Sequence, residues 1–261
     1  MAGGAGDNAA SAVGMGLVRP GQGFVSLGTS GVVFVSGAHF APNPAQGLHA
    51  FCHALPGRWH QMSVMLSAAG AVSWAARTLG FDHEAALLTA AARLAPGERA
   101  AAPLFLPYLS GERTPHNQPL ATGVWFGMTA AHGRDALAYA VAEGVGFGLR
   151  DGLQTLSATE PPLRALSLVG GGARDAWWAQ LLADTLGLTL SVHAGGETGA
   201  ALGAARLAWL ACGGAIDTVC ATPPVTRHFE PDAASHTALV LRHTRFQALY
   251  TALLPQFLHA E

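Results

Sequence analysis

The sequence predicts a single α/β domain, and two patterns lead to that prediction. Residues 23–37 contain two short apolar runs joined by Gly28-Thr29-Ser30-Gly31, which is typical of a β-hairpin. In the last third of the chain, strand-like runs alternate with helix-like segments, which indicates parallel strands joined by crossover helices. With 261 residues, 50% of them hydrophobic, the chain is long enough to bury one large core.

The elements of the first half can be assigned in chain order. Residues 8–16 are small and apolar, and Asp7 precedes them as the predicted N-cap of a short helix. Beyond the hairpin, the apolar patterns predict strands at 48–55 and 59–65 and helices at 68–79 and 82–94. Residues 101–119 then read as a strand followed by a polar loop that prolines interrupt.

The second half begins with a short strand and a long helix. The run GVWFGMT at 123–129 predicts the strand, and apolar residues at helical spacing predict a helix over 134–155. The alternating region follows, with strands at 163–172 and 188–194 and helices at 175–186 and 198–211. The proline-rich stretch 221–232 is expected to end this unit, and 236–258 is expected to form a closing helix.

Composition excludes several classes of function. The net charge is −2 and only 11% of residues are charged, so no surface for nucleic acid or an anionic membrane is expected. No apolar run is long enough to span a membrane, no signal peptide is recognisable, and three widely spaced cysteines suggest reduced thiols in the cytoplasm. All 14 basic residues are arginines, which excludes a P-loop lysine, a protein-kinase strand lysine and a Schiff-base lysine.

Two glycine-rich turns carry groups that could bind a nucleotide. In the predicted hairpin, the Gly28–Gly31 turn offers backbone N–H groups and the hydroxyls of Thr29 and Ser30, which suit a phosphate or its Mg²⁺. The Gly170–Gly172 turn follows a strand and precedes a helix, which favours a floor under an adenosine. It lacks the GxGxxG spacing of a dinucleotide site. For either turn, and for those at Gly3–Gly6 and Gly195–Gly199, a purely structural role is the alternative.

Five motifs occur in the order found in FGGY-family carbohydrate kinases, which this sequence resembles from Gly3 to about Leu258. The motifs are GDN at 6–8, LGTSG at 27–31, LPYLSGERTPHN at 106–117, GVWFGMT at 123–129 and GGGAR at 170–174. The resemblance implies an actin-like (ribonuclease-H-like) ATPase domain, with a mixed sheet flanked by helices and a helical insertion. It implies that residues 1–261 are the C-terminal, nucleotide-binding domain with the hinge segment, and that the N-terminal domain is absent from this sequence.

The resemblance also assigns roles to individual residues. Asp7 becomes the catalytic base and, with Asn8, a contact to the sugar, and Thr29 faces the γ-phosphate. The ATP-binding residues that it implies are Gly28, Thr29, Ser30, Gly171, Gly172, Ala173 and Gly199. The expected cofactors are ATP and Mg²⁺, with no metal held by the chain's own side chains. Ala136 and Ala142 depart from the family's second signature, where a polar and a larger apolar residue are usual.

The implied activity is phosphorylation of D-xylulose to D-xylulose 5-phosphate in carbohydrate metabolism. Two alternatives stay open, namely a family kinase for ribulose, glycerol or gluconate, and a non-enzymatic nucleotide-binding module. The presence of Asp7 argues against the module, because a protein that only binds nucleotide needs no base. The expected partners are the sugar, ATP and the N-terminal FGGY domain, a homodimer is left open, and neither nucleic acid nor membrane is expected.

Three further groups of residues invite functional interpretation. His49, Cys52, His53 and His60 resemble metal ligands, but on a strand His49 and Cys52 point to opposite faces, so no metal site is predicted. Glu112 and Arg113 are expected to pair with each other or with nearby groups, and a role near the cleft is equally open. Trp177 and Trp178 are expected in the core or an interface, with Trp178 close to the adenosine floor.

Overall fold

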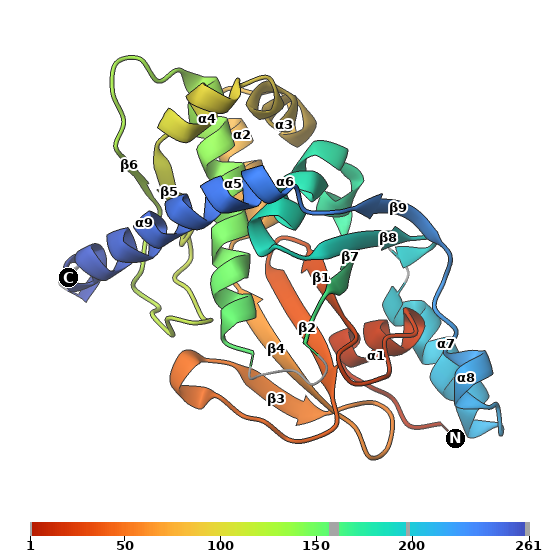
Figure 1. Cartoon of the computed structure of the whole chain (residues 1–261). Coiled ribbons are helices and arrows are strands. Elements are labelled where there is room, and N and C mark those ends of the chain that lie inside the picture. The colour runs from red at the N-terminus through yellow and green to blue at the C-terminus, as the bar shows by residue number, and fades with distance from the viewer. Residues whose placement is uncertain (1, 157–161, 197–198, 259–261) are drawn as a thin grey trace.

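The computed structural model describes residues 2–156, 162–196 and 199–258 (Figure 1). In these residues a seven-stranded sheet has the order β3-β4-β2-β1-β7-β8-β9. The strands are β1 (Gly23–Leu27), β2 (Gly31–Gly37), β3 (His49–Cys52), β4 (Trp59–Met65), β7 (Ala165–Val169), β8 (Thr189–His193) and β9 (Val225–Phe229). Strand β1 pairs parallel with β7, and β7 with β8, whereas the remaining neighbours are antiparallel. The predicted α/β domain with a mixed sheet is therefore confirmed.

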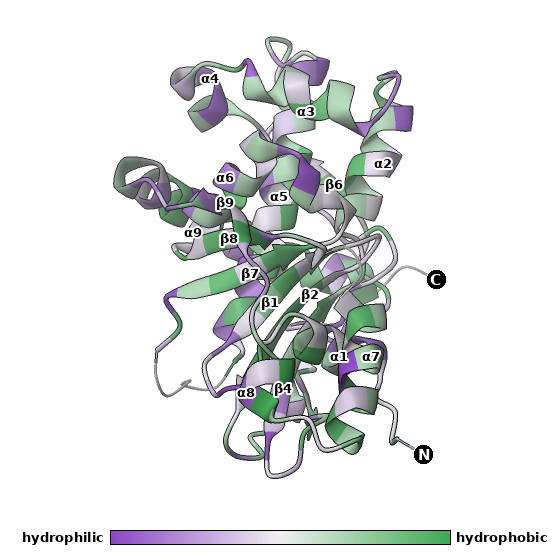
Figure 2. Cartoon of the chain, turned by 90° about the vertical axis from the view of Figure 1, so that its right-hand side faces the viewer, coloured by the Kyte–Doolittle hydropathy of each residue, from purple (hydrophilic) through white to green (hydrophobic). Residues whose placement is uncertain are grey.

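Helices cover both faces of the sheet. The helices are α1 (Asp7–Gly14), α2 (Ala69–Thr78), α3 (Glu84–Ala92), α4 (Pro96–Ala101), α5 (Arg134–Gln154), α6 (Ala176–Leu186), α7 (Gly199–Ala211), α8 (Ile216–Val219) and α9 (Ala233–Leu258), with 3₁₀ turns η1 (Pro44–Gln46) and η2 (Gly171–Arg174). The main core joins Val25 and Leu27 to helices α2, α5 and α6, and a second cluster joins Phe24 to α1. Because successive strand residues point to opposite faces, one strand serves both layers. Figure 2 shows the two sets of helices on opposite sides of the apolar strands.

The long helix α5 lies at the centre of the larger layer. It contacts α2, α3, α6 and α9, and it also packs against β5 (Leu104–Leu106), which forms a small antiparallel sheet with β6 (Val124–Phe126). A buried ion pair joins it to α9, with Arg242 Nε and Nη2 each 2.6 Å from the Glu143 carboxylate. The described part of the chain contains no helix long and apolar enough to cross a membrane.

Helices α1 and α7 approach each other unusually closely on the opposite layer. A Cβ added to Gly203 would lie 1.8 Å from the carbonyl oxygen of Ala10, and one added to Gly14 would lie 1.9 Å from that of Gly199. Only glycine at these positions permits this spacing. Arg206 strengthens the contact by donating to the carbonyls of Val13 and Gly14 at the end of α1.

The structure corrects three predictions about local elements. Asp7 is not the N-cap, because α1 is capped by Gly6 and Asp7 is its first helical residue. The proline-rich stretch 221–232, expected only to end the alternating unit, contains β9, which continues the sheet beyond β8. The helix predicted at 82–94 begins at Glu84 after an N-cap at His83, rather than at Asp82. The strands predicted in 101–119 and 123–129 are confirmed as β5 (Leu104–Leu106) and β6 (Val124–Phe126), which pair in a separate two-stranded sheet.

Candidate functional site

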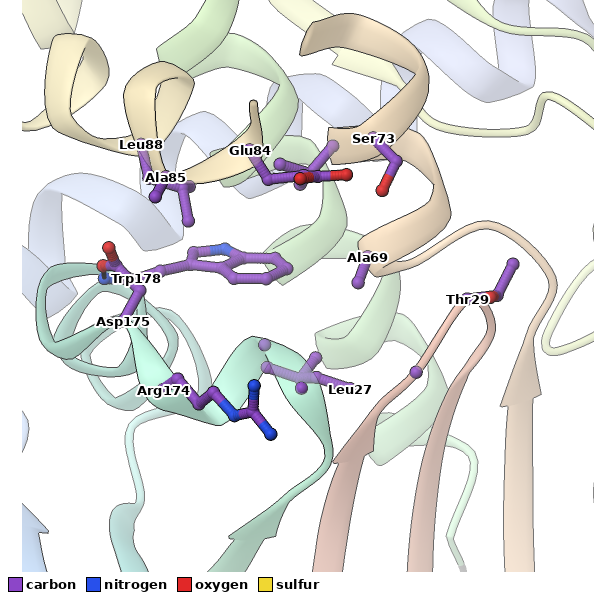
Figure 3. Close-up of a pocket in the computed structure, with 14 residues that line it drawn as sticks. Leu27, Thr29, Ala69, Ser73, Glu84, Ala85, Leu88, Arg174, Asp175 and Trp178 are labelled. Carbon is purple, nitrogen blue, oxygen red and sulfur yellow. Dashed lines mark hydrogen bonds between the residues drawn. The ribbon is translucent and has the colours of Figure 1, made fainter. Parts of the chain in front are cut away.

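A cavity of about 560 Å³ opens where β1 and β7 end (Figure 3). Its walls come from the tip of the β1–β2 hairpin, the η2 turn and helices α2, α3 and α6. The lining residues are Leu27, Gly28, Thr29, Ala69, Val72, Ser73, Glu84, Ala85, Leu88, Gly171, Gly172, Arg174, Asp175 and Trp178. Because parallel β1 and β7 are neighbours, the two glycine turns that follow them meet at the same edge of the sheet. This juxtaposition is what a nucleotide site in an open α/β sheet requires.

The hairpin tip is held by the first turn of α2. The carbonyl of Thr29 accepts hydrogen bonds from the N–H groups of Ala68, at 2.9 Å, and Gly70, at 3.1 Å. The carbonyl of Gly28 accepts one from Ala69 at 3.0 Å. The Gly28 N–H is bonded to the Ser30 carbonyl across the turn, so a phosphate at this tip would meet the exposed Thr29 and Ser30 instead.

The η2 turn requires glycine for two separate reasons. Gly170 has a φ of +92°, a conformation that residues with a Cβ rarely adopt. A Cβ at Gly172 would lie 2.7 Å from the Trp178 ring and 2.8 Å from the Leu27 side chain. At Gly171, by contrast, an added Cβ would meet nothing within 4 Å, so this glycine leaves open space at the cavity.

Helix α6 contributes a flat wall. Asp175 caps the helix by accepting from the Trp178 N–H at 2.9 Å, and this fixes the first turn. The Trp178 ring is 1% exposed, and its Nε1 donates to the Ala142 carbonyl of α5 at 3.2 Å. Figure 3 shows the ring between Leu27 and the start of α3. The prediction that Trp178 belongs to the core yet lies close to the glycine turn is confirmed.

The charged groups of the cavity lie at its rim. Arg174 is exposed, and among the described lining residues it alone carries a full positive charge. Glu84, at the start of α3, has a lowered pKa, chiefly because the Ser73 hydroxyl donates a hydrogen bond to its carboxylate. Arg174 would attract a phosphate, whereas Glu84 and Asp175, which also line the cavity, would repel one. The apolar wall beside Trp178 would suit a flat ring.

The residues fit ATP better than they fit a protein-held metal ion. An apolar pocket with a few polar groups at one end is the usual form of a cofactor site. Within the described residues no group of three or more His, Cys, Asp or Glu side chains could hold a metal ion. A Mg²⁺ ion that keeps its waters and is bound mainly by substrate phosphates needs no such group. The hydroxyls of Thr29 and Ser30 lie at the hairpin tip, where the phosphates would reach the protein.

The structure brings together four of the predicted nucleotide-binding residues, Gly28, Thr29, Gly171 and Gly172. Ser30 adjoins them on the hairpin turn. Ala173 is the buried residue of η2; its carbonyl accepts from Arg227 at 2.6 Å, and it does not line the cavity. Gly199 begins α7 and packs against α1, so it also lies away from the lining.

Asp7 and Asn8 lie on the other layer, at the start of α1. Asp7 is exposed, and its Oδ1 accepts from the backbone N–H of Asn8 at 2.8 Å and from the Asn8 amide at 3.2 Å. The cavity lining does not include either residue. Because Asn8 is its only hydrogen-bond partner among the described residues, the Asp7 carboxylate is accessible to a second molecule or domain.

Sequence reasoning missed part of the cavity. Ser73, Glu84 and Arg174 were not singled out, and the first two stand on helices α2 and α3, where a polar residue in an apolar pattern carries no signal of its own. Arg174 could have been found from the sequence, because it lies two residues after the glycines of the η2 turn.

Glu112 and Arg113 were expected to pair with each other or with nearby groups. They do pair, but the Arg113 backbone N–H, not its guanidinium, donates to Glu112 Oε1 at 2.7 Å.

Comparison with known proteins agrees with this geometry. Residues 23–212 match the C-terminal domain of the FGGY family of carbohydrate kinases. A xylulose kinase of Escherichia coli is 48% identical over 255 residues, which cover 97% of this chain and 52% of that protein. A xylulose kinase of Klebsiella pneumoniae is 52% identical over 212 residues, covering 81% and 43% respectively. The chain thus spans about half the length of the curated relatives it matches.

Solved structures show the same architecture. The crystal structure of a xyloylose kinase from Brucella ovis superposes with a TM-score of 0.91 at 43% identity, covering 97% of this chain and 52% of that one. A xylulose kinase from Rhodospirillum rubrum gives 0.85 at 29% identity, covering 98% and 52%. The expected actin-like ATPase fold is confirmed by these neighbours. The chain therefore belongs to the FGGY family of carbohydrate kinases, with which it shares the C-terminal domain.

Proposed function

We propose that this chain is the C-terminal half of an ATP-dependent kinase that phosphorylates D-xylulose to D-xylulose 5-phosphate. The relatives that are 48% and 52% identical over 255 and 212 aligned residues are named xylulose kinases, and the alignments cover 52% and 43% of their lengths. The observation that carries the proposal is the cavity itself, in which Thr29 of the hairpin and Gly171 and Gly172 of η2 meet.

In this proposal the cavity binds ATP with its base on the apolar side. The buried side chains of Leu27, Leu88 and Trp178 form the apolar base of the cavity beneath the adenine, and Gly171 leaves room for the ribose. The phosphates extend toward the Thr29 hydroxyl, with Arg174 supplying positive charge. Phosphoryl transfer passes through a loose transition state, so positioning and charge neutralisation supply most of the acceleration, and Mg²⁺ bound to the phosphates supplies part of that charge.

Asp7 acts as the general base in this proposal. As the sugar hydroxyl attacks the γ-phosphorus, its proton passes to the Asp7 carboxylate, the bond from phosphorus to the bridging oxygen breaks, and ADP leaves. The exposure of Asp7 supports this role, because a second domain carrying the sugar can approach it. Asn8 lies beside it as a contact to the sugar and bonds the same carboxylate oxygen.

The test is turnover of the two-domain protein that contains this chain. ADP release is measured with D-xylulose, ribulose, glycerol and gluconate at equal concentrations. We expect kcat/KM for D-xylulose to exceed the others by at least about tenfold, since a site built for one set of hydroxyls rejects analogues that leave its polar groups unpaired. A preference for another substrate would contradict the xylulose assignment, and no turnover with any of them would contradict the kinase assignment.

A further inference from the structure

Glu112 is a buried acid that the cavity does not use. It belongs to the loop 111–118, and it is only 2% exposed. Its Oε1 accepts hydrogen bonds from the backbone N–H of Leu66, at 2.9 Å, and of Arg113, at 2.7 Å, whereas its Oε2 has no partner. Burying a carboxyl group with one unpartnered oxygen costs free energy. We therefore asked what the hydrogen bond from Leu66 to Glu112 does for the fold.

The loop that carries Glu112 is fastened to β4. The Thr114 N–H donates to the Val64 carbonyl at 3.1 Å, and the Val64 N–H donates to the Thr114 hydroxyl at 3.1 Å. That hydroxyl donates in turn to the Gly47 carbonyl at 3.1 Å. Thr114 and Glu112 thus hold two positions, Val64 and Leu66, at the point where β4 ends and the connection to α2 begins.

The same connection holds the hairpin tip. Within four residues of Leu66, the N–H groups of Ala68, Ala69 and Gly70 donate to the carbonyls of Gly28 and Thr29. The fit is tight, because a Cβ on Gly70 would lie 2.9 Å from both the Thr29 carbonyl oxygen and its methyl carbon. A shift of Leu66 would therefore move the surface against which Thr29 rests.

We infer that Glu112 is a positioning residue for phosphoryl transfer, which through Leu66 fixes the 66–70 segment and thereby the placement of Thr29. The inference rests on the proposed function insofar as Thr29 faces the transferred phosphate. It assigns a role to the SGERTP motif at 110–115, which lies on another sheet connection and does not line the cavity.

The charge of Glu112 is not needed for this role. Burial raises the pKa of Glu112 to about 7. The neutral acid still presents Oε1 to the Leu66 N–H and would carry its proton on the unpartnered Oε2. Glutamine offers the same oxygen in a side chain of equal length, so Glu112→Gln should keep the position of Leu66, whereas Glu112→Ala should lose it.

The first test is amide hydrogen exchange of this chain, followed by NMR. In Glu112→Ala we expect the amides of Ala68, Ala69 and Gly70 to exchange at least about tenfold faster, with β8 amides unchanged; Glu112→Gln should stay within about threefold of the parent. Unchanged exchange at 68–70 in Glu112→Ala would overturn the inference. Should that variant not fold, Thr114→Val loosens the same loop and is judged by the same amides.

The second test is turnover in the two-domain protein. A misplacement on the order of 1 Å can cost about 10² in rate, so Glu112→Ala should lower kcat ten- to a hundredfold, with KM for ATP changed less than about threefold. Glu112→Gln should recover most of kcat. Asp184→Ala is the control, because it removes a buried acid that accepts from Asp232 and Gln180 and does not line the cavity, and it should leave kcat within about twofold.

The two tests separate failure of the inference from failure of the function. Equal losses of kcat in the Asp184 and Glu112 variants, or no recovery by glutamine, would reduce Glu112 to a residue of general stability. If the parent protein phosphorylates no sugar, the proposed function is wrong, and the exchange result still decides whether Glu112 positions the hairpin tip.

Discussion

At the scale of single residues, Asp7 is the position on which the proposed chemistry depends most. It stands at the exposed first turn of α1, and its carboxylate is bonded only to its neighbour Asn8 among the described contacts. Because it is not the cap of the helix, its replacement should cost little stability. The structure thus separates a chemical role for Asp7 from a structural one.

In the two-domain protein, we expect Asp7→Asn to reduce kcat by about 10² to 10⁴, because an amide cannot accept the proton of the sugar hydroxyl. The melting temperature and ADP affinity should stay close to those of the parent. Asp217→Asn, an exposed first-turn aspartate of α8, is the control and should leave kcat unchanged. Turnover by Asp7→Asn above about a tenth of the parent rate would show that Asp7 is not the base.

Buried histidines make the stability of the fold depend on pH. Burial lowers the pKa of His53, His60 and His116 from 6.5 to about 4. Between these values the unfolded chain binds protons that the folded chain does not, so these groups make the free energy of unfolding fall as the pH falls from 6.5 toward 4. Glu112, whose pKa is raised to about 7, acts in the opposite direction above its ordinary value of 4.5.

The histidine contribution can be isolated with His60→Gln. Urea unfolding of this chain is measured at pH 5, 5.75 and 6.5 for the parent and the variant. The free energy of unfolding should fall with decreasing pH more steeply in the parent than in the variant. The two slopes should differ by up to about 1.4 kcal/mol per pH unit, because the variant takes up one fewer proton when it unfolds. Parallel curves would mean that His60 is not held in its neutral form.

At the scale of elements, the contact between α1 and α7 sets where Asp7 stands relative to the sheet. We expect Gly203→Ala to lower the free energy of unfolding by about 1–3 kcal/mol or more, because its Cβ would lie 1.8 Å from the Ala10 carbonyl. Gly97→Ala in α4, where a Cβ meets nothing within 4 Å, is the matched control and should be neutral or stabilising. Equal effects in urea titrations would contradict the close approach.

The joint between α5 and α9 depends on the buried Glu143–Arg242 pair. Arg242 also donates to the carbonyls of Ala100, Ala102 and Pro103, so it joins three segments. Arg242→Met should destabilise the chain by about 3–5 kcal/mol, since Glu143 would be left buried without its partner. Exposed Arg245 of the same helix is the control.

Adding Glu143→Leu to Arg242→Met should recover part of that loss but not all of it, because the three carbonyls would still lack a donor. Arg245→Met should change the free energy of unfolding by less than about 0.5 kcal/mol in the same urea titrations. A loss of that small size in Arg242→Met would show that the pair contributes nothing to the joint.

Element by element, the sequence predicted what depends on local patterns. The hairpin turn, the long helix α5 and the β7–α6–β8 unit follow from apolar periodicity and glycine, and they are confirmed. Strand β9 was missed because two prolines precede it and polar residues dominate it, and its pairing with β8 is a non-local property. The capping of α1 was wrong because an aspartate suits the first helical turn as well as the cap.

At the scale of the whole molecule, the cavity was only half predictable. The glycine turns could be found because each follows an apolar strand, and parallel pairing of β1 and β7 places them together. Ser73 and Glu84 could not be found, since only the folding of α2 and α3 over the edge of the sheet brings them to the cavity. Local sequence thus identifies the floor of the site, and tertiary packing supplies its walls.

Binding of ADP to this chain tests the central claim, which is that the cavity between the hairpin tip and η2 is a nucleotide site. Gly171→Leu should block it without strain, because a Cβ there meets nothing within 4 Å. Gly97→Leu, on open surface in α4, is the control for the added side chain.

Calorimetric titration with ADP and Mg²⁺ at up to millimolar concentration should give heat for the parent and for Gly97→Leu. Binding is expected to be weak, because the chain spans only about half the length of its relatives and, in the proposed function, a second domain completes the enzyme. In Gly171→Leu the heat should disappear while the melting temperature without ligand stays unchanged. No heat with the parent, or equal binding by Gly171→Leu, would contradict a nucleotide site in this cavity.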